Sequence, residues 1–205
     1  MSIVVDFPGG NVYHYKRLRT YEKCMGIQLY NCEYSLDISL VDETTWKQRR
    51  TKDMSIFMLG IDHNMAPVDI RALFAFTRKN TGEALLKLKK EPGICGCIIL
   101  STCNRLELWV STEENEKPEL YQWLCRLKGI EGEEYRKYFI SRENEEAVEH
   151  LFYLTSGLKS QILGEDQILT QIKDALNLAR EHFTTDSILE VLFRMAVTAL
   201  SLIHI

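Results

Sequence analysis

A cysteine among polar side chains is the part of this sequence best suited to chemistry. Residues 101–105 read Ser-Thr-Cys-Asn-Arg and directly follow an apolar run. A thiolate is a strong nucleophile, and a nearby cation such as Arg105 lowers a thiol pKa and raises the thiolate fraction. Arg105 is also suited to binding a substrate carboxylate through two parallel hydrogen bonds. The alternative is that Cys103 is a small buried hydrophobic residue and Arg105 a surface charge.

Two histidines are candidates for moving a proton beside this thiol. His63 follows the end of a predicted strand, and His150 lies in a predicted helix one turn before Leu154. An imidazole can act as general acid or base near neutral pH. A solvated turn residue and a satisfied core histidine are the respective alternatives.

A second polar cluster, Gly-Glu-Asp-Gln at residues 164–167, precedes another predicted helix. Acidic side chains favour the positive end of a helix, so helix capping is the preferred interpretation of Asp166. Glu165 and Gln167 are also able to hold an amino group.

Composition and the absence of certain motifs exclude several classes of protein. The apolar and charged fractions, 45% and 26%, are those of a globular protein, and the net charge of −4 gives no overall basic field. There is no apolar run long enough to span a bilayer and no secretory signal, so a cytoplasmic location is expected. The sequence has neither G-x-G-x-x-G nor a P-loop, so no dinucleotide site is predicted. The six cysteines form no C-x-x-C pair, so no metal site is predicted: Cys24, Cys32, Cys95, Cys97, Cys103 and Cys125.

The elements that must position these residues follow from periodicity and from glycine and proline. A helix begins at Pro67, with Val68, Ile70, Leu73 and Phe74 available for its buried side. Strands are predicted at 55–61, 95–100, 106–110 and 135–140, further helices at 82–90 and 118–128, and helices after residue 140. Because strands and helices do not alternate strictly, the pattern predicts an α+β domain followed by helices.

Three segments resemble the signature motifs of glutamyl-tRNA reductases, in the right order and spacing. They are residues 60–71, residues 100–107 around Cys103, and residues 150–169, which begin His-Leu-Phe. The resemblance covers residues 54–199. It implies a ferredoxin-like mixed sheet with packed helices, followed by helices leading toward a long linker helix.

The resemblance implies the first step of tetrapyrrole synthesis, in which NADPH reduces glutamyl-tRNA to glutamate-1-semialdehyde. Cys103 is then the catalytic nucleophile that forms a glutamyl thioester, and His150 is an activity-linked residue. Family substrate positions fall on Thr102, Asn104, Arg105, Ser160, Glu165, Asp166, Gln167 and Gln171. Two departures, Asn64-Met65 in place of Lys-Thr and Asp166 in place of proline, do not involve the nucleophile. The implied partners are glutamyl-tRNA, the aminomutase that uses the semialdehyde, and a second copy of the chain.

The ends of the chain do not resemble the family. Residues 1–53 are expected to be an N-terminal extension or a mis-called start, and residues 54–199 the catalytic domain. Residues 200–205 are expected to be an artefactual tail, because one reading frame of a transposase sequencing adapter encodes them. The family's NADPH and dimerisation domains are expected to be missing, leaving only thioester formation or an esterase-like reaction.

Two other classes of function remain open. A non-catalytic module could bind glutamyl-tRNA or a haem-pathway partner, although such a module has no need of a nucleophile between substrate-binding groups. A cysteine hydrolase using Cys103 with His63 or His150 would act on simple thioesters without tRNA.

Overall fold

A computed structural model describes residues 3–6, 12–15, 54–113, 116–155 and 167–201. The chain forms two compact units, residues 1–53 and 54–205. In the first unit, β1 (Ile3–Asp6) and β2 (Val12–Tyr15) form an antiparallel pair. All the sequence features singled out as candidates for chemistry lie in the second unit.

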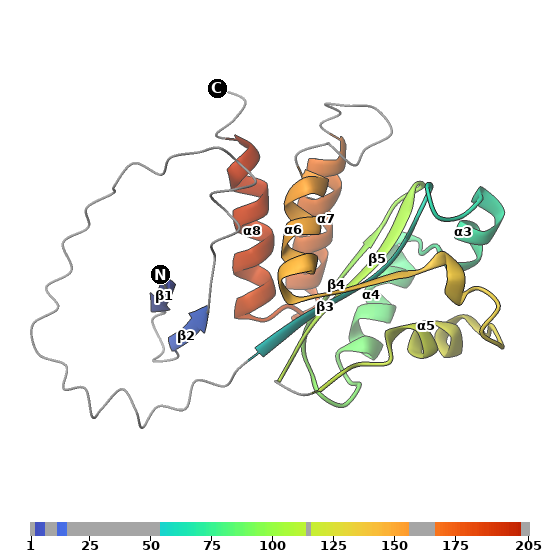
Figure 1. Ribbon diagram of the computed structural model, residues 1–205, viewed down its shortest axis with the longest axis horizontal. Coiled ribbons are helices and arrows are strands. Elements are labelled where there is room, and N and C mark those ends of the chain that lie inside the picture. Colours follow the sequence, from blue (N-terminus) through green and yellow to red (C-terminus); the bar gives the residue numbers. More distant parts are fainter. Residues whose placement is uncertain (1–2, 7–11, 16–53, 114–115, 156–166, 202–205) are drawn as a thin grey trace, which may run out of the picture. The chain divides into compact units, whose positions relative to one another are not determined.

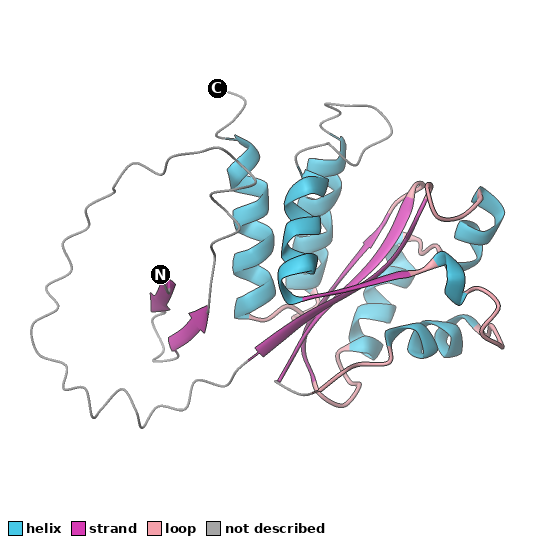
Figure 2. Cartoon of the chain, in the orientation of Figure 1, coloured by secondary structure: helices cyan, strands magenta, loops and turns pink. Residues whose placement is uncertain are grey.

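The second unit is built on one four-stranded sheet. In chain order its first part consists of β3 (Met54–Asp62), α3 (Val68–Phe74), α4 (Arg78–Leu88), β4 (Ile94–Ser101), β5 (Arg105–Glu113), α5 (Leu120–Lys128) and β6 (Ile140–Glu143). Three helices complete it: α6 (Asn144–Thr155), α7 (Gln167–Glu181) and α8 (Ser187–Ser201). Figures 1 and 2 show α3–α5 on one side of the sheet and α6–α8 on the other.

The strand order β4-β5-β3-β6 confirms the ferredoxin-like α+β prediction. All three neighbouring pairs are antiparallel, so the expectation of a mixed sheet was wrong in this detail. The reason is that β4 and β5 form a hairpin that inserts β5 between β3 and β4. The strands that run parallel, β3 with β4 and β5 with β6, are therefore never hydrogen-bonded neighbours.

Helices on both faces explain why β5 is buried along almost its whole length. Successive side chains of a strand point to opposite faces. Leu106, Leu108 and Val110 therefore face one helical layer, while Glu107 and Trp109 face the layer that contains α6 and α8. Trp109 packs edge-on against Phe193 of α8, with ring centroids 5.4 Å apart. The polar side chains of such a buried strand must find their hydrogen-bond partners inside the protein.

The predicted strand at 135–140 was wrong. Residues Arg136–Tyr138 form a 3-10 turn, and the strand begins only at Ile140. Aromatic residues favour strands, but here they fill a gap between helices instead. The Phe139 ring lies edge-on to Phe74 of α3 and to Tyr121 of α5, at 5.0 Å and 5.3 Å.

The buried side of helix α3 is smaller than predicted. Val68 and Leu73 are 69% and 45% exposed, and Phe74 is fully buried. The helix is only seven residues long, so it presents a single large side chain to the core. Thr77 caps the following helix α4 by accepting a hydrogen bond from the Asn80 amide.

Asp186 fixes α8 to the sheet. Its Oδ1 accepts from the Leu189 amide at 3.0 Å, and its Oδ2 accepts from Ser111 Oγ at 2.7 Å. Gly96 of β4 lies against this carboxylate: a Cβ there would lie 2.6 Å from Asp186 Oδ1 and 2.8 Å from Ser111 Oγ. The neighbouring Cys97 amide donates to the Thr184 carbonyl at 2.8 Å, so the α7–α8 connection also pairs with the outer edge of β4.

Gly96→Ala is expected to lower the free energy of unfolding by about 2 kcal/mol, because the new methyl group displaces a helix cap. Gly82→Ala is the matched control. A Cβ at Gly82 would meet only the end of the His182 ring, which can rotate away, and alanine is favoured over glycine inside a helix. Urea denaturation of both variants measures the difference. Equal losses of stability would contradict this account of Gly96.

Candidate functional site

The reactive loop is a tight connection between β4 and β5. Ser101 pairs with Leu106, and the Thr102 amide donates to the Arg105 carbonyl at 2.8 Å, which leaves Cys103 and Asn104 at the tip. Thr102 Oγ1 accepts from the amides of Asn104 and Arg105 at 3.2 Å and 3.1 Å. The Thr102 hydroxyl, predicted to contact substrate, therefore shapes the loop itself. Among the free cysteines of the described segments, Cys103 is the exposed one.

The start of the loop is anchored to the connection between α3 and α4. Ser101 Oγ accepts from the Phe76 amide at 3.0 Å and donates to the Phe76 carbonyl at 3.3 Å. Lys128 of α5 donates to the Ala75 carbonyl and lies 3.7 Å from the centre of the Phe76 ring. Burial lowers the pKa of Lys128. These contacts hold the backbone that carries Cys103 from two elements outside the sheet.

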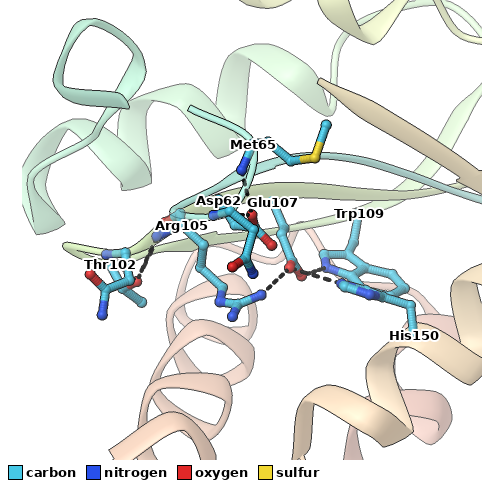
Figure 3. Close-up of polar contacts among 9 residues, drawn as sticks. Asp62, Met65, Thr102, Arg105, Glu107, Trp109 and His150 are labelled. Atoms are coloured by element: carbon cyan, nitrogen blue, oxygen red, sulfur yellow. Dashed lines mark hydrogen bonds and ion pairs between the residues drawn. The ribbon is translucent and has the colours of Figure 1, made fainter. Parts of the chain in front are cut away.

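A buried polar cluster lies behind the loop, and its centre is Glu107. Arg105 Nη1 donates to Glu107 Oε1 at 3.0 Å, His150 Nε2 shares the same oxygen at 2.9 Å, and Trp109 Nε1 donates to Oε2 at 3.1 Å. Figure 3 shows Arg105 reaching from the loop to one side of the carboxylate, with His150 and Trp109 on the other. Arg105, Glu107 and His150 are 4%, 2% and 4% exposed.

The cluster keeps Glu107 ionised. Burial alone would raise the pKa of this carboxyl group, but the hydrogen bond and charge of His150 and then those of Arg105 outweigh it. The result is a pKa of about 2 in place of 4.5. An ionised carboxylate only accepts hydrogen bonds, so His150 Nε2 carries a proton and donates it. Glu107 therefore fixes the orientation and tautomer of His150 and the direction of Arg105.

Because of this cluster, the free energy of unfolding is expected to fall at acidic pH. The pKa of Glu107 is lower in the folded chain than in the unfolded chain, so its ionised form stabilises the fold above about pH 4.5. That contribution, on the order of 3 kcal/mol, is lost as pH falls from 4.5 toward 2. Urea unfolding across this range should show stability falling more steeply in the parent than in Glu107→Gln. Equal pH dependence in the two proteins would refute the assignment.

Sequence reasoning missed the role of Glu107, the only charged residue in the predicted strand 106–110. Arg105 and Glu107 are two residues apart in a strand, so they share a face, and that pairing was a readable signal. Gly60, opposite Glu107 in the register, leaves room for the carboxylate: a Cβ there would lie 3.3 Å from Glu107 Cγ.

The other candidate residues lie on different elements. Gln167 is exposed at the first position of α7, and Gln171 is half-buried one turn later. His63 lies in the turn after β3, where its buried Nδ1 has no hydrogen-bond partner among the described residues. The predictions for Ser160, Glu165 and Asp166 lie outside the described residues.

A surface cavity of about 410 Å³ adjoins the cluster from the side of α6. It is lined by Arg142, Glu146, Glu149, His150 and Tyr153. Among the residues that the structure describes, the lining includes none from the 101–105 loop. His150 thus lies between this cavity and the Glu107 carboxylate.

The described residues include neither a membrane-spanning helix nor a metal-binding group. The helices that the structure describes include none with the length and apolar character needed to cross a membrane. Within the same segments, no three His, Cys, Asp or Glu side chains are grouped so that they could hold a metal ion.

Comparison with known proteins gives one consistent family. The model of the glutamyl-tRNA(Glu) reductase N-terminal domain matches residues 59–203. A glutamyl-tRNA reductase of Acetivibrio thermocellus is 44% identical over 146 residues, which is 71% of this chain and 44% of that protein. A probable multifunctional siroheme biosynthesis protein HemA of Ruminiclostridium josui is 40% identical over 149 residues, 71% of this chain and 28% of that protein.

A solved structure agrees. The glutamyl-tRNA reductase from Methanopyrus kandleri superposes with a TM-score of 0.58 at 29% identity, covering 70% of this chain and 32% of that one. This chain therefore spans less than half the length of the relatives it matches.

Proposed function

Because the chain belongs to the glutamyl-tRNA reductase family through that family's N-terminal domain, we propose that it transfers the glutamyl group of glutamyl-tRNA to Cys103. The observation that carries this proposal is the position of the thiol. Cys103 is exposed at the tip of a hairpin whose two strands are buried on both faces. A nucleophile held this way is accessible while its backbone is fixed.

The proposed step exchanges one ester for another. The Cys103 thiolate attacks the carbonyl carbon of the ester that joins glutamate to the tRNA. A C–S bond forms, the C–O bond to the ribose breaks, and the released ribose oxygen takes a proton. The thiol proton goes to a base, for which His150 and His63 are the candidates. The product is a thioester, which a hydride donor reduces more readily than an ester because sulfur donates poorly into the carbonyl.

Several roles around the nucleophile are part of the same proposal. Arg105 binds the side-chain carboxylate of the glutamyl group, since a guanidinium matches a carboxylate with two hydrogen bonds. Glu107 is a positioning residue, because it orients both Arg105 and His150. Asn104, at the loop tip, and Gln167 and Gln171 on α7 are further substrate contacts.

In this proposal, reduction of the thioester requires the full-length protein of the family. We assign the NADPH-dependent step, giving glutamate-1-semialdehyde, to the part of the relatives that this chain does not match. Dimerisation and transfer of the semialdehyde to an aminomutase are proposed on the family resemblance alone.

Intact-protein mass spectrometry after mixing the chain with glutamyl-tRNA tests the central step. We expect a single glutamyl adduct that hydroxylamine removes, as it does for thioesters. Retention of the tRNA without any adduct would favour the non-catalytic binding module. Absence of both adduct and binding would refute the proposal for this chain.

A further inference from the structure

The solvent-facing side of α4 is strongly basic. Arg78, Lys79 and Lys87 are exposed on the helix, and Lys90 is exposed just after it. The one exposed acid among them is Glu83. Within the described segments none of these four cations takes part in an ion pair. This local charge contrasts with the net charge of −4 of the whole chain.

Two of these cations lie where they oppose helix formation. Arg78 and Lys79 occupy the first turn of α4, which contains no acidic residue. The N-terminus of a helix carries a partial positive charge, so cations there are unfavourable and acids favourable. Thr77 already caps the helix through its side chain. The basic first turn therefore does not serve the stability of α4.

The basic surface begins beside the nucleophile. Phe76, two residues before Arg78, is hydrogen-bonded to Ser101, two residues before Cys103. Since an extended chain covers at most about 3.6 Å per residue, the backbones of Arg78 and Cys103 lie within roughly 20 Å of each other. From there α4 runs along the sheet on the side away from α6–α8 (Figure 1). Lys79 and Lys87 are about 12 Å apart along the helix axis.

We propose that this face of α4 binds the phosphates at the acceptor end of glutamyl-tRNA. The inference rests on the proposed function, because it assumes that an ester at the 3′ end of an RNA reaches Cys103. The phosphates nearest that ester then lie at a range from Cys103 comparable to that of Arg78, where the basic surface begins. Lysine and arginine contacts to phosphates position an RNA without reading its bases. They give affinity that falls steeply with salt.

The test compares two triple variants with the same change in charge. One carries Arg78→Glu, Lys79→Glu and Lys87→Glu; the control carries Lys137→Glu, Lys173→Glu and Arg194→Glu, exposed cations on other elements. The measured quantity is the Kd for deacylated glutamate tRNA at several salt concentrations. We expect the α4 variant to bind at least about tenfold more weakly at 0.1 M salt, with a log–log salt slope shallower by roughly 2 to 3.

Two further measurements distinguish RNA binding by this surface from effects of net charge or of fold stability. The single variant Glu83→Lys is expected to bind the tRNA more tightly. The thermal midpoint of the α4 variant should stay close to that of the parent, because Arg78→Glu and Lys79→Glu favour the helix N-terminus and offset the acid that Lys87→Glu places in the last turn. Equal weakening by the control variant, or no tRNA binding by the parent, would overturn the proposal.

Acylation experiments distinguish this proposal from the function on which it rests. A small glutamyl thioester carries no phosphate, so it should acylate Cys103 equally in the parent and the α4 variant. If glutamyl-tRNA also acylates both at the same rate below saturation, the RNA surface is refuted and the thioester step stands. If neither donor acylates the parent while the α4 variant still loses tRNA affinity, the thioester step fails and the surface stands.

Discussion

Replacing Cys103 by serine is expected to abolish the glutamyl adduct, with acyl transfer slower by roughly 10³-fold or more. A serine hydroxyl is far less ionised than a thiol near neutral pH and is a poor nucleophile without a strong base. The variant preserves the size of the side chain at an exposed loop tip, so the fold should be unaffected. Intact-protein mass spectrometry with glutamyl-tRNA measures the adduct, and thermal unfolding checks the fold.

The remaining cysteines provide the controls for that experiment. Cys95 is half-buried, and Cys95→Ser should leave the adduct unchanged. Burial raises the pKa of Cys97 to about 12, despite the opposing effects of Thr184 and Lys89, so Cys97 stays a thiol at neutral pH. An adduct of undiminished yield on Cys103→Ser, or its loss in Cys95→Ser, would show that the nucleophile has been misassigned.

The second large effect is expected from Glu107→Ala. Removing this carboxylate takes away the acceptor that the buried Arg105 guanidinium shares with two buried N–H groups, those of His150 and Trp109. Breaking one side of a buried ion pair typically costs about 3–5 kcal/mol. Urea denaturation at pH 7 should show a loss of this size. Cys103 acylation should also slow, because Arg105 and His150 lose their common orienting group.

Glu107→Gln separates geometry from charge at this position. The amide keeps the size of the side chain and can still accept from Arg105 and His150, so it should lose less stability than alanine. If Glu107 acts by positioning, the glutamine variant should recover part of the acylation rate as well. A fully stable alanine variant would mean that the cluster contributes nothing to the fold. Unchanged acylation in both variants would remove Glu107 from the mechanism.

The sequence pattern predicted the secondary structure correctly where a segment's own residues determine it. The apolar run at 55–61 and the tandem strands at 95–100 and 106–110 appear as β3, β4 and β5, nearly at the predicted positions. Pro92 and Gly93 marked the turn before β4. The prediction at 135–140 was wrong because the packing of Phe139 between Phe74 and Tyr121 overrode its strand propensity.

The sequence by itself determined the reactive loop, its position between two buried strands, and the family to which the chain belongs. Those properties depend on residues that are neighbours in the chain. The tertiary structure alone decided what surrounds the loop. Glu107 meets His150 across 43 residues, Ser101 meets Phe76 across 25, and Ser111 meets Asp186 across 75. Such contacts depend on how helices pack on the sheet, and a one-dimensional pattern carries no information on which distant polar groups will share one buried space.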